Sequence, residues 1–312
     1  MKSRVLQHGR LLPAMENVLH GEFAAHRLAD EADAGAFLAR HGGEFNVLVT
    51  SARFGADAAM IAALPALKAI CSFGVGYDTI DVDAAMRRGI VVSNTPDVLN
   101  DCVADIAFGL LIDIARGISA SDHFVRRGDW LKGAFPLQTR VSGKRLGILG
   151  LGRIGRVIAK RAAGFDMEVR YHNRQPVAGV EYAYEPSLTG LARWADFLIV
   201  ASAGGDNTRH LVSAEVINAL GPEGYLINIS RGSVIDEPAL VDALMSRRIG
   251  GAGLDVFDKE PSVPAALLAL DNVVLLPHIG SGTRETRQAM ADLTMANVRA
   301  FLATGSLITA VA

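Results

Sequence analysis

Three side chains suited to anion binding and proton transfer occur in the second half of the chain. Arg231, Glu260 and His278 each lie just beyond an apolar run with the character of a β-strand. A guanidinium holds a carboxylate through two hydrogen bonds, and an imidazole gains or loses a proton near neutral pH. Ligands of open α/β sheets bind at the carboxyl ends of the strands, so these three positions are candidates for one site.

A glycine-rich turn stands between an apolar run and a helical pattern. Residues 146–149 lead into the sequence Gly150-Leu151-Gly152-Arg153-Ile154-Gly155, and a second strand-like run follows at 167–172. In a dinucleotide-binding turn the first glycine permits a tight bend, the second lets a pyrophosphate approach the backbone, and the third lets helix and strand pack closely. The helix N-terminus offers free N–H groups to the anion. An ordinary turn with packing glycines is the alternative, and the strand–turn–helix context favours the dinucleotide site.

The residues after that second strand bear on the choice between NAD and NADP. An NAD site places a carboxylate there, which accepts a hydrogen bond from the ribose 2′-OH. This chain has His172, Asn173 and Arg174 instead. An amide can bond to a hydroxyl or a phosphate, and a guanidinium matches phosphate oxygens. The pattern predicts a preference for NADPH, with NADH possible, and a solvated loop arginine is the alternative.

Strand-like runs alternate with helical patterns along most of the chain, which is typical of parallel α/β structure. The predicted strands are 45–50, 67–72, 90–93, 146–149, 167–172, 197–202, 225–228, 253–256 and 273–275. The predicted helices are 56–64, 81–88, 98–119, 154–163, 188–195, 213–220, 237–246 and 283–304. Residues 126–140 show no period, which is typical of a functional loop or an interface arm. Together these patterns predict two doubly wound, Rossmann-like α/β domains.

Composition narrows the class of protein. A chain of 312 residues exceeds what one core usually holds, and 50% hydrophobic with 21% charged residues is typical of a packed globular protein. The net charge of −2 gives no reason to expect a nucleic-acid or anionic-membrane partner. No run is long and apolar enough for a membrane span, and residues 1–12 lack the apolar stretch of a signal peptide. With only Cys71 and Cys102, and no histidines at metal-ligand spacing, we expect a cytoplasmic protein without a metal.

These motifs, in this order, resemble those of the D-isomer-specific 2-hydroxyacid dehydrogenases. The resemblance runs from Ser72-Phe73-Gly74-Val75-Gly76-Tyr77-Asp78, through the glycine-rich turn, to Pro277-His278-Ile279-Gly280-Ser281. It is nearest to NADPH-dependent glyoxylate/hydroxypyruvate reductases and to hydroxyphenylpyruvate reductases. It implies a discontinuous substrate-binding domain of residues 1–97 and 283–312, and a dinucleotide-binding domain of residues 98–282.

The resemblance implies that the protein reduces a small 2-keto acid, glyoxylate or hydroxypyruvate, to the D-2-hydroxy acid with NADPH. His278 is then the general acid, Glu260 bonds the other ring nitrogen and favours the imidazolium, and Arg231 binds the carboxylate and polarises the carbonyl. The remaining residues expected to contact substrate are Phe54, Gly74, Val75, Gly76 and Ser281.

The resemblance also extends the cofactor site beyond the glycine-rich turn. Asp255 corresponds to a family residue that contacts the nicotinamide carboxamide, and Ser230 and Gly280 are expected to border the cofactor. A homodimer is implied as well, built from helix 98–119 and the arm 126–140.

Substrate size depends on the wall facing the third carbon of the keto acid. Phe54 follows the strand 45–50 and, if it points inward, leaves little room for an aryl group. This favours glyoxylate and hydroxypyruvate over phenylpyruvate, whereas a Phe54 packed into the core would give no such preference.

Two other functions remain open. A hydroxyphenylpyruvate-type or other 2-keto acid reductase would use the same catalytic residues with a different specificity. A dinucleotide-sensing corepressor could use the same fold, but the complete Arg231, Glu260 and His278 set and the lack of a basic patch argue against it. Turnover of any 2-keto acid discriminates between an enzyme and a corepressor.

Overall fold

The computed structural model describes residues 5–311, so the predicted domain ranges extend beyond the described residues at Met1–Arg4 and Ala312. The chain divides into two compact units, Met1–Leu99 with Thr283–Ala312, and Asn100–Gly282. It therefore leaves the first unit once and returns to it near the C-terminus. Both units are built on parallel sheets, which confirms the α/β class.

The first unit contains a five-stranded sheet of order β2-β1-β3-β4-β5. This is the flavodoxin-like doubly wound order, in which the winding reverses between β1 and β3. The strands are β1 (Val5–Gln7), β2 (His26–Arg27), β3 (Val47–Ser51), β4 (Ala69–Phe73) and β5 (Val91–Ser93). The helices are α1 (Pro13–Phe23), α2 (Ala34–His41), α3 (Ala58–Ala62), α4 (Val82–Arg87) and α12 (Arg284–Thr304), with 3₁₀ turns η1 (Leu28–Asp30) and η2 (Gly42–Glu44).

The central strands of this unit, β3 and β4, are buried at every position, as expected for a parallel sheet covered on both faces. Helix α12 returns to pack against β4, so the C-terminal segment belongs to this unit. The sequence pattern predicts no element before residue 45. Strands of three and two residues, such as β1 and β2, are too short to show a period.

The second unit contains a seven-stranded sheet of order β12-β11-β10-β9-β6-β7-β8. Numbered from β6, this is the Rossmann order, and its winding reverses between β6 and β9. The strands are β6 (Arg145–Leu149), β7 (Glu168–His172), β8 (Ala183–Tyr184), β9 (Phe197–Val200), β10 (Tyr225–Asn228), β11 (Gly251–Leu254) and β12 (Val273–Leu275). The helices are α5 (Asn100–Arg116), α6 (Ile118–Arg126), α7 (Arg153–Ala162), α8 (Leu188–Trp194), α9 (Ala214–Leu220), α10 (Glu237–Met245) and α11 (Ala265–Leu268). The 3₁₀ turns are η3 (Asp129–Leu131), η4 (Ala163–Phe165), η5 (Asp206–Thr208) and η6 (Gly232–Val234).

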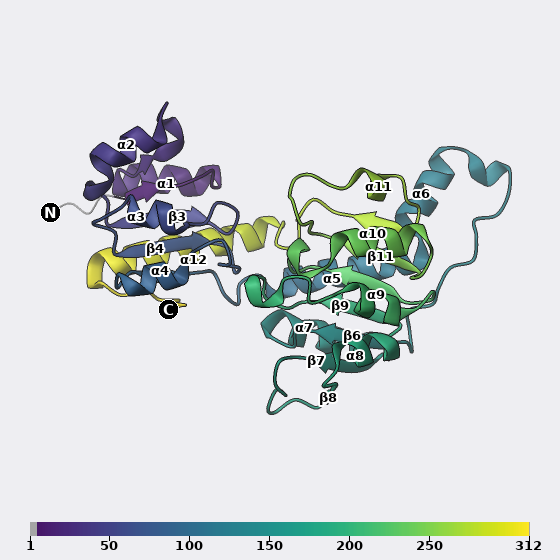
Figure 1. Ribbon diagram of the computed structural model, residues 1–312. Helices are drawn as coiled ribbons and strands as arrows, with labels where there is room; N and C mark the ends of the chain where they lie inside the picture. The colour runs from purple at the N-terminus through teal and green to yellow at the C-terminus, as the bar shows by residue number, and fades with distance from the viewer. Residues whose placement is uncertain (1–4, 312) are drawn as a thin grey trace. The chain divides into compact units, whose positions relative to one another are not determined.

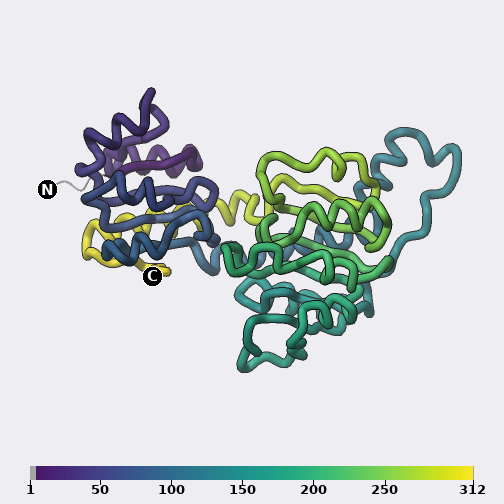
Figure 2. The backbone as a smooth tube through the Cα atoms, viewed as in Figure 1, coloured from purple at the N-terminus to yellow at the C-terminus, as the bar shows by residue number. Residues whose placement is uncertain are grey.

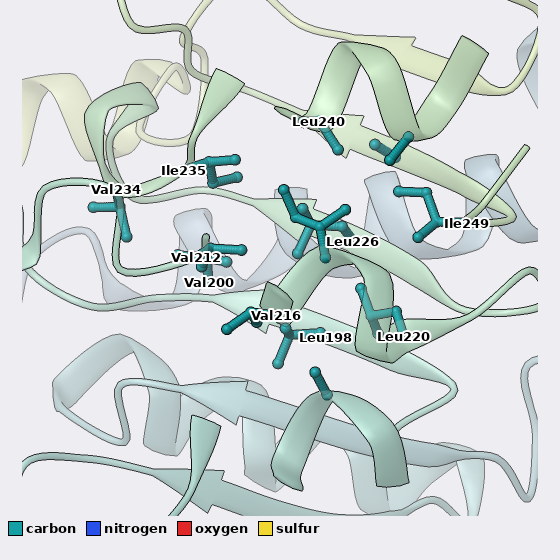
Figure 3. Packing of buried hydrophobic residues seen from close by; sticks show 14 of the residues in the cluster. Leu198, Val200, Val212, Val216, Leu220, Leu226, Val234, Ile235, Leu240 and Ile249 are labelled. Carbon is teal, nitrogen blue, oxygen red and sulfur yellow. The ribbon is translucent and has the colours of Figure 1, made fainter. Parts of the chain in front are cut away.

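Helices pack on this second sheet as the doubly wound order requires. Helices α5 and α7 pack against each other, and α9 packs between α8 and α10 (Figure 1). Leucine, isoleucine and valine side chains from β9, β10, α9 and α10 form the core beneath those last helices (Figure 3). Gly253 in β11 makes room for α5, because a Cβ at Gly253 would lie 2.9 Å from Leu110 Cβ.

The prediction of one helix over 98–119 is wrong. Helix α5 ends at Arg116 and a separate helix, α6, begins at Ile118. Gly117 between them has a left-handed φ of 61°, which ends the first helix, and the Asp113 carboxylate accepts the Ser119 N–H at 2.8 Å. The strand predicted at 253–256 lies two residues earlier, because Gly251 pairs with Tyr225 in the register of β10 and β11.

The segment after α6 is irregular, as predicted, apart from the short turn η3. Together with α6 it extends away from the sheet of its unit as an open excursion of the chain (Figure 2). Its apolar side chains face solvent, with Trp130, Leu131 and Leu137 exposed by 68%, 94% and 101%. No helix within residues 5–311 combines the length and the apolar character needed to cross a membrane.

Candidate active site

The glycine-rich turn joins β6 to α7 at the point where the winding of the second sheet reverses. Gly150 has a φ of 99° and its backbone packs on the end of β9, since a Cβ there would lie 2.6 Å from Ser202 N. Gly155 packs on the carbonyl of Gly150, with a Cβ position 2.1 Å from that oxygen. Gly152 has no atom within 4 Å of its Cβ position. The first and third glycines are therefore needed for packing, and the second leaves open space beside the helix N-terminus.

The end of β7 lies next to this turn. The Asn173 side-chain oxygen accepts the Leu151 N–H at 2.7 Å, so the amide binds the glycine-rich turn to the neighbouring strand. Its oxygen is engaged in this way, and its NH₂ group is the donor that a ribose hydroxyl or a phosphate would meet. Arg174 is exposed beside it, and no carboxylate stands at the end of β7.

These features fit a bound nicotinamide dinucleotide. The open space over Gly152 allows a pyrophosphate to approach the backbone closely, as a dinucleotide site requires. The side-chain oxygens of Ser202 and Ser230, which follow β9 and β10, are buried without a hydrogen-bond partner among residues 5–311. Buried hydroxyls are normally bonded, so two at one sheet edge indicate a polar ligand there. No cluster of metal-ligating side chains occurs in the same described residues.

Arg231 lies in a short loop that is fixed by hydrogen bonds from Asn228 and by packing at Gly232. The Asn228 side chain at the end of β10 donates to the Arg231 carbonyl at 2.9 Å and accepts the Ser230 N–H at 3.0 Å. Gly232 then lies directly on the loop that follows β11, because a Cβ there would lie 1.9 Å from the carbonyl carbon of Phe257. The loop that carries Arg231 is thus packed against the loop that carries Glu260.

Glu260 and His278 form a hydrogen-bonded pair at this edge. Nδ1 of His278 lies 2.7 Å from Oε2 of Glu260, and the Phe257 N–H donates to Oε1 at 3.2 Å. Burial favours the neutral acid, but the hydrogen bond and charge of His278, the Phe257 N–H and the charge of Arg231 hold the pKa of Glu260 below its ordinary value. Glu260 is therefore ionised at neutral pH and can stabilise an imidazolium.

Asp255 positions the loop that carries His278. Its buried carboxylate accepts the N–H groups of Ile279 and Gly280 at 2.7 and 2.8 Å, and its carbonyl accepts the His278 N–H at 2.9 Å. These bonds hold His278 at a φ of 56°, a left-handed conformation that is uncommon for residues other than glycine. Burial raises the pKa of Asp255, and the two N–H groups partly offset that rise.

Two further positioning residues, Asn228 and Glu237, are not predicted from the sequence pattern. Asn228 is a polar residue, 1% exposed, at the end of an apolar strand, which is a detectable signal. Glu237 accepts the Asp258 N–H at 3.0 Å and so holds the loop before Glu260. Nothing local distinguishes Glu237 from an ordinary acid in the first turn of a helix.

The first unit holds the other predicted substrate contacts at the carboxyl ends of its strands. In the turn after β4, the carbonyls of Gly74 and Val75 accept the Thr95 N–H at 2.9 Å and the Asn94 side chain at 2.8 Å. The N–H groups of Val75 and Gly76 have no partner among the described residues, which leaves two donors for an anion.

Phe54 lies outside the core of this unit. Its ring is 42% exposed and rests on Gly9, whose Cβ position lies 2.2 Å from Phe54 Cδ2. The rings of His8 and Phe54 form a T-shaped pair with a centroid distance of 5.8 Å. This contact joins the loops after β1 and β3, where the winding of the first sheet reverses.

A Rossmann-order sheet with this glycine-rich turn, and with arginine, glutamate and histidine at its carboxyl edge, defines an NAD(P)-dependent oxidoreductase. Residues 108–280 match the family model "D-isomer specific 2-hydroxyacid dehydrogenase, NAD binding domain". The chain belongs to this family, whose members act on the CH–OH group of 2-hydroxy acids and use a nicotinamide dinucleotide.

Individual relatives cover most of the chain. A hydroxyphenylpyruvate reductase from Plectranthus scutellarioides is 49% identical over 88% of both chains. A glyoxylate/hydroxypyruvate reductase A from Arabidopsis thaliana is 46% identical over 95% of both. Among solved structures, an NADPH-dependent glyoxylate/hydroxypyruvate reductase from Sinorhizobium meliloti, in complex with NADP and malonate, is 43% identical with a TM-score of 0.94 and covers 100% of this chain and 97% of its own.

Proposed function

We propose that the protein reduces a small 2-keto acid, glyoxylate or hydroxypyruvate, with NADPH to the 2-hydroxy acid, which is the D-isomer where the product is chiral. The bound dinucleotide supplies the hydride. His278 delivers a proton from Nε2 to the substrate oxygen, since its Nδ1 is held by Glu260. Arg231 binds the carboxylate and polarises the carbonyl. The Glu260–His278 pair beside the Arg231 loop is the observation that carries this proposal.

Further residues of the proposed site follow from their positions. The N–H groups of Val75 and Gly76 bind the substrate carboxylate, and Ser281, three residues beyond His278, contacts the substrate. The turn residues Gly150, Leu151, Gly152, Arg153, Ile154 and Gly155, with Asn173, Arg174, Ser230, Asp255 and Gly280, border the cofactor. Leu151 acts through its bond to Asn173 rather than by donating to the phosphate, because its N–H is already engaged.

A substrate panel tests the proposal. The purified protein is assayed with glyoxylate, hydroxypyruvate, phenylpyruvate and hydroxyphenylpyruvate, each with NADPH and NADH. The configuration of the product is determined on a chiral column for the last three acids, because the product from glyoxylate has no stereocentre. We expect turnover, the D-isomer wherever the product is chiral, and the highest kcat/KM for the two small acids. Absence of turnover with all four acids and both cofactors would refute the assignment as an enzyme. Better reduction of hydroxyphenylpyruvate than of glyoxylate would favour the alternative suggested by the Plectranthus relative.

Cofactor preference depends on Arg174. Removal of a guanidinium from a phosphate costs about 1.5–3 kcal/mol, or about 10- to 100-fold in affinity. Arg174→Ala is therefore expected to raise the KM for NADPH by that factor and to leave the KM for NADH within about twofold, as the matched control. A wild-type preference for NADH, or an unchanged KM for NADPH in the variant, would contradict this assignment.

Phe54 is proposed to limit the size of the substrate. With its ring on Gly9 rather than in the core, Phe54 can border a keto acid bound at the carboxyl ends of β3 and β4. Phe54→Ala should raise kcat/KM for phenylpyruvate by about tenfold, a typical effect of pocket volume, while glyoxylate changes little. An equal change for both substrates would show that the ring acts only through stability.

We also propose a homodimer formed through α5, α6 and the exposed segment that follows. The segment exposes the large apolar side chains of Trp130, Leu131 and Leu137. This is more exposed apolar surface than one segment of a monomer usually carries. Sedimentation at micromolar concentration should give twice the monomer mass, and Trp130→Ala with Leu131→Ser should shift the protein toward monomer. A wild-type monomer would exclude the proposal.

A cytoplasmic location is proposed from the cysteines. Cys71 and Cys102 are both buried and belong to no disulfide. Burial raises the pKa of Cys71 to about 12, with a partly offsetting hydrogen bond from Ser93, so this thiol stays protonated and unreactive.

A further inference from the structure

The second unit has a pocket on the edge of its sheet opposite the proposed active site. It has a volume of about 480 Å³, within the range of small-molecule sites. Its walls are formed by Thr139, Arg140, Lys144, Pro222, Glu223 and Tyr225. These residues lie at the amino ends of β6 and β10, whereas the glycine-rich turn and Arg231 follow the carboxyl ends of the same strands. None of the proposed catalytic or cofactor residues lines the pocket.

The pocket carries more positive than negative charge. Arg140 and Lys144 form no close ion pair among residues 5–311, although the charge of Lys144 helps to lower the pKa of Asp196. The neighbouring acid, Asp196, is already engaged, because Arg145 binds Oδ1 through Nη2 at 2.9 Å and Oδ2 through its N–H at 2.8 Å. Glu223 is the single acid in the pocket wall, so two cations face one anion.

A hydroxyl donor is available beside these cations. Thr139 Oγ1 and Tyr225 OH lie 2.8 Å apart, and either can donate to the other. Each hydroxyl carries one proton, and the hydrogen bond between them uses only one of the two. The other O–H therefore remains available to donate to a ligand. Tyr225 is held in place by stacking on the buried ring of Phe197, with centroids 5.2 Å apart. Thr139 is fixed through its N–H, which donates to Ala115 at 2.9 Å.

We propose that this pocket binds a small oxyanion, the carboxylate or phosphate group of a metabolite, through Arg140, Lys144 and the hydroxyl pair. Two cations outside any close ion pair and a fixed O–H donor are what such a group requires. An anion bound in the pocket would connect the C-terminal end of the exposed segment 126–140 to the start of β10, because Thr139 and Arg140 end that segment. The site is independent of the proposed reductase activity.

Calorimetric titration of the full-length protein, saturated with NADPH at constant ionic strength in chloride, tests this site. Inorganic phosphate and succinate are the two probes, and they distinguish a phosphate group from a carboxylate. Removal of both cations in R140Q/K144Q should weaken binding of the preferred probe by about tenfold or more. E223Q should tighten it a few-fold, because a like charge is removed. The matched control K160Q/R193Q removes two exposed cations elsewhere in the unit and should bind as wild type does.

Two further readouts separate this site from general charge effects. Amide exchange at residues 139–144 and 222–225 should slow when the anion binds to wild type. The swap R140K/K144R keeps both charges and should retain binding, which covers the case in which R140Q/K144Q does not fold. Equal binding by wild type and R140Q/K144Q, or an equal loss in K160Q/R193Q, would overturn the proposal.

Discussion

His278→Ala is expected to lower kcat for keto-acid reduction by about 100-fold or more, the usual contribution of a general acid. The variant lacks the imidazole that delivers a proton from Nε2 and that holds the 2.7 Å contact with Glu260 through Nδ1. The measurement is steady-state turnover at saturating NADPH and glyoxylate. Because His278 is 46% exposed, its loss should leave folding and NADPH binding intact, which fluorescence titration checks. A kcat within tenfold of wild type would exclude His278 as the acid.

The second variant at this pair is Glu260→Gln, and we expect it to shift the pH profile of keto-acid reduction. The carboxylate stabilises the imidazolium, so its removal lowers the pH at which reduction declines on the alkaline side, with a smaller loss of kcat than His278→Ala. The pKa of Glu260 is depressed in the folded protein, despite burial, by His278, the Phe257 N–H and Arg231. Its contribution to stability is therefore present above the pKa of an unfolded glutamate and is lost as the pH falls through the depressed value. An unchanged pH profile would refute the coupling.

Gly232→Ala is expected to damage both stability and activity. A Cβ there would lie 1.9 Å from the Phe257 carbonyl carbon and 2.2 Å from Asp258 N, and these backbone atoms cannot rotate away. Overpacking of this kind costs about 1–3 kcal/mol. A shift of about 1 Å between the Arg231 and Glu260 loops can cost about 100-fold in kcat/KM.

The matched control is Gly164→Ala, where no atom lies within 4 Å of the Cβ position. Thermal unfolding should show a Tm lowered by several degrees for Gly232→Ala and little change for Gly164→Ala, with kcat/KM for glyoxylate following the same order. If Gly232→Ala keeps wild-type Tm and turnover, the packing of these two loops does not determine the site.

Local patterns in the sequence were enough to predict the parallel α/β class and most elements after residue 45. Apolar runs, glycine turns and helix periods are properties of neighbouring residues. The break at Gly117 was missed because apolar residues continue across it, and only the left-handed backbone, with Asp113 bonded to Ser119, shows that two helices meet there.

The sequence by itself determined which side chains could do the chemistry, because residue type and position after a strand are enough to nominate Arg231, Glu260 and His278. Only the tertiary structure decided their arrangement. Glu260 and His278 are 18 residues apart, and their bond depends on the packing of the loops after β11 and β12. The bond from Leu151 to Asn173 likewise spans two strands. Such contacts depend on strand order and loop packing, which leave no periodic signal in the chain.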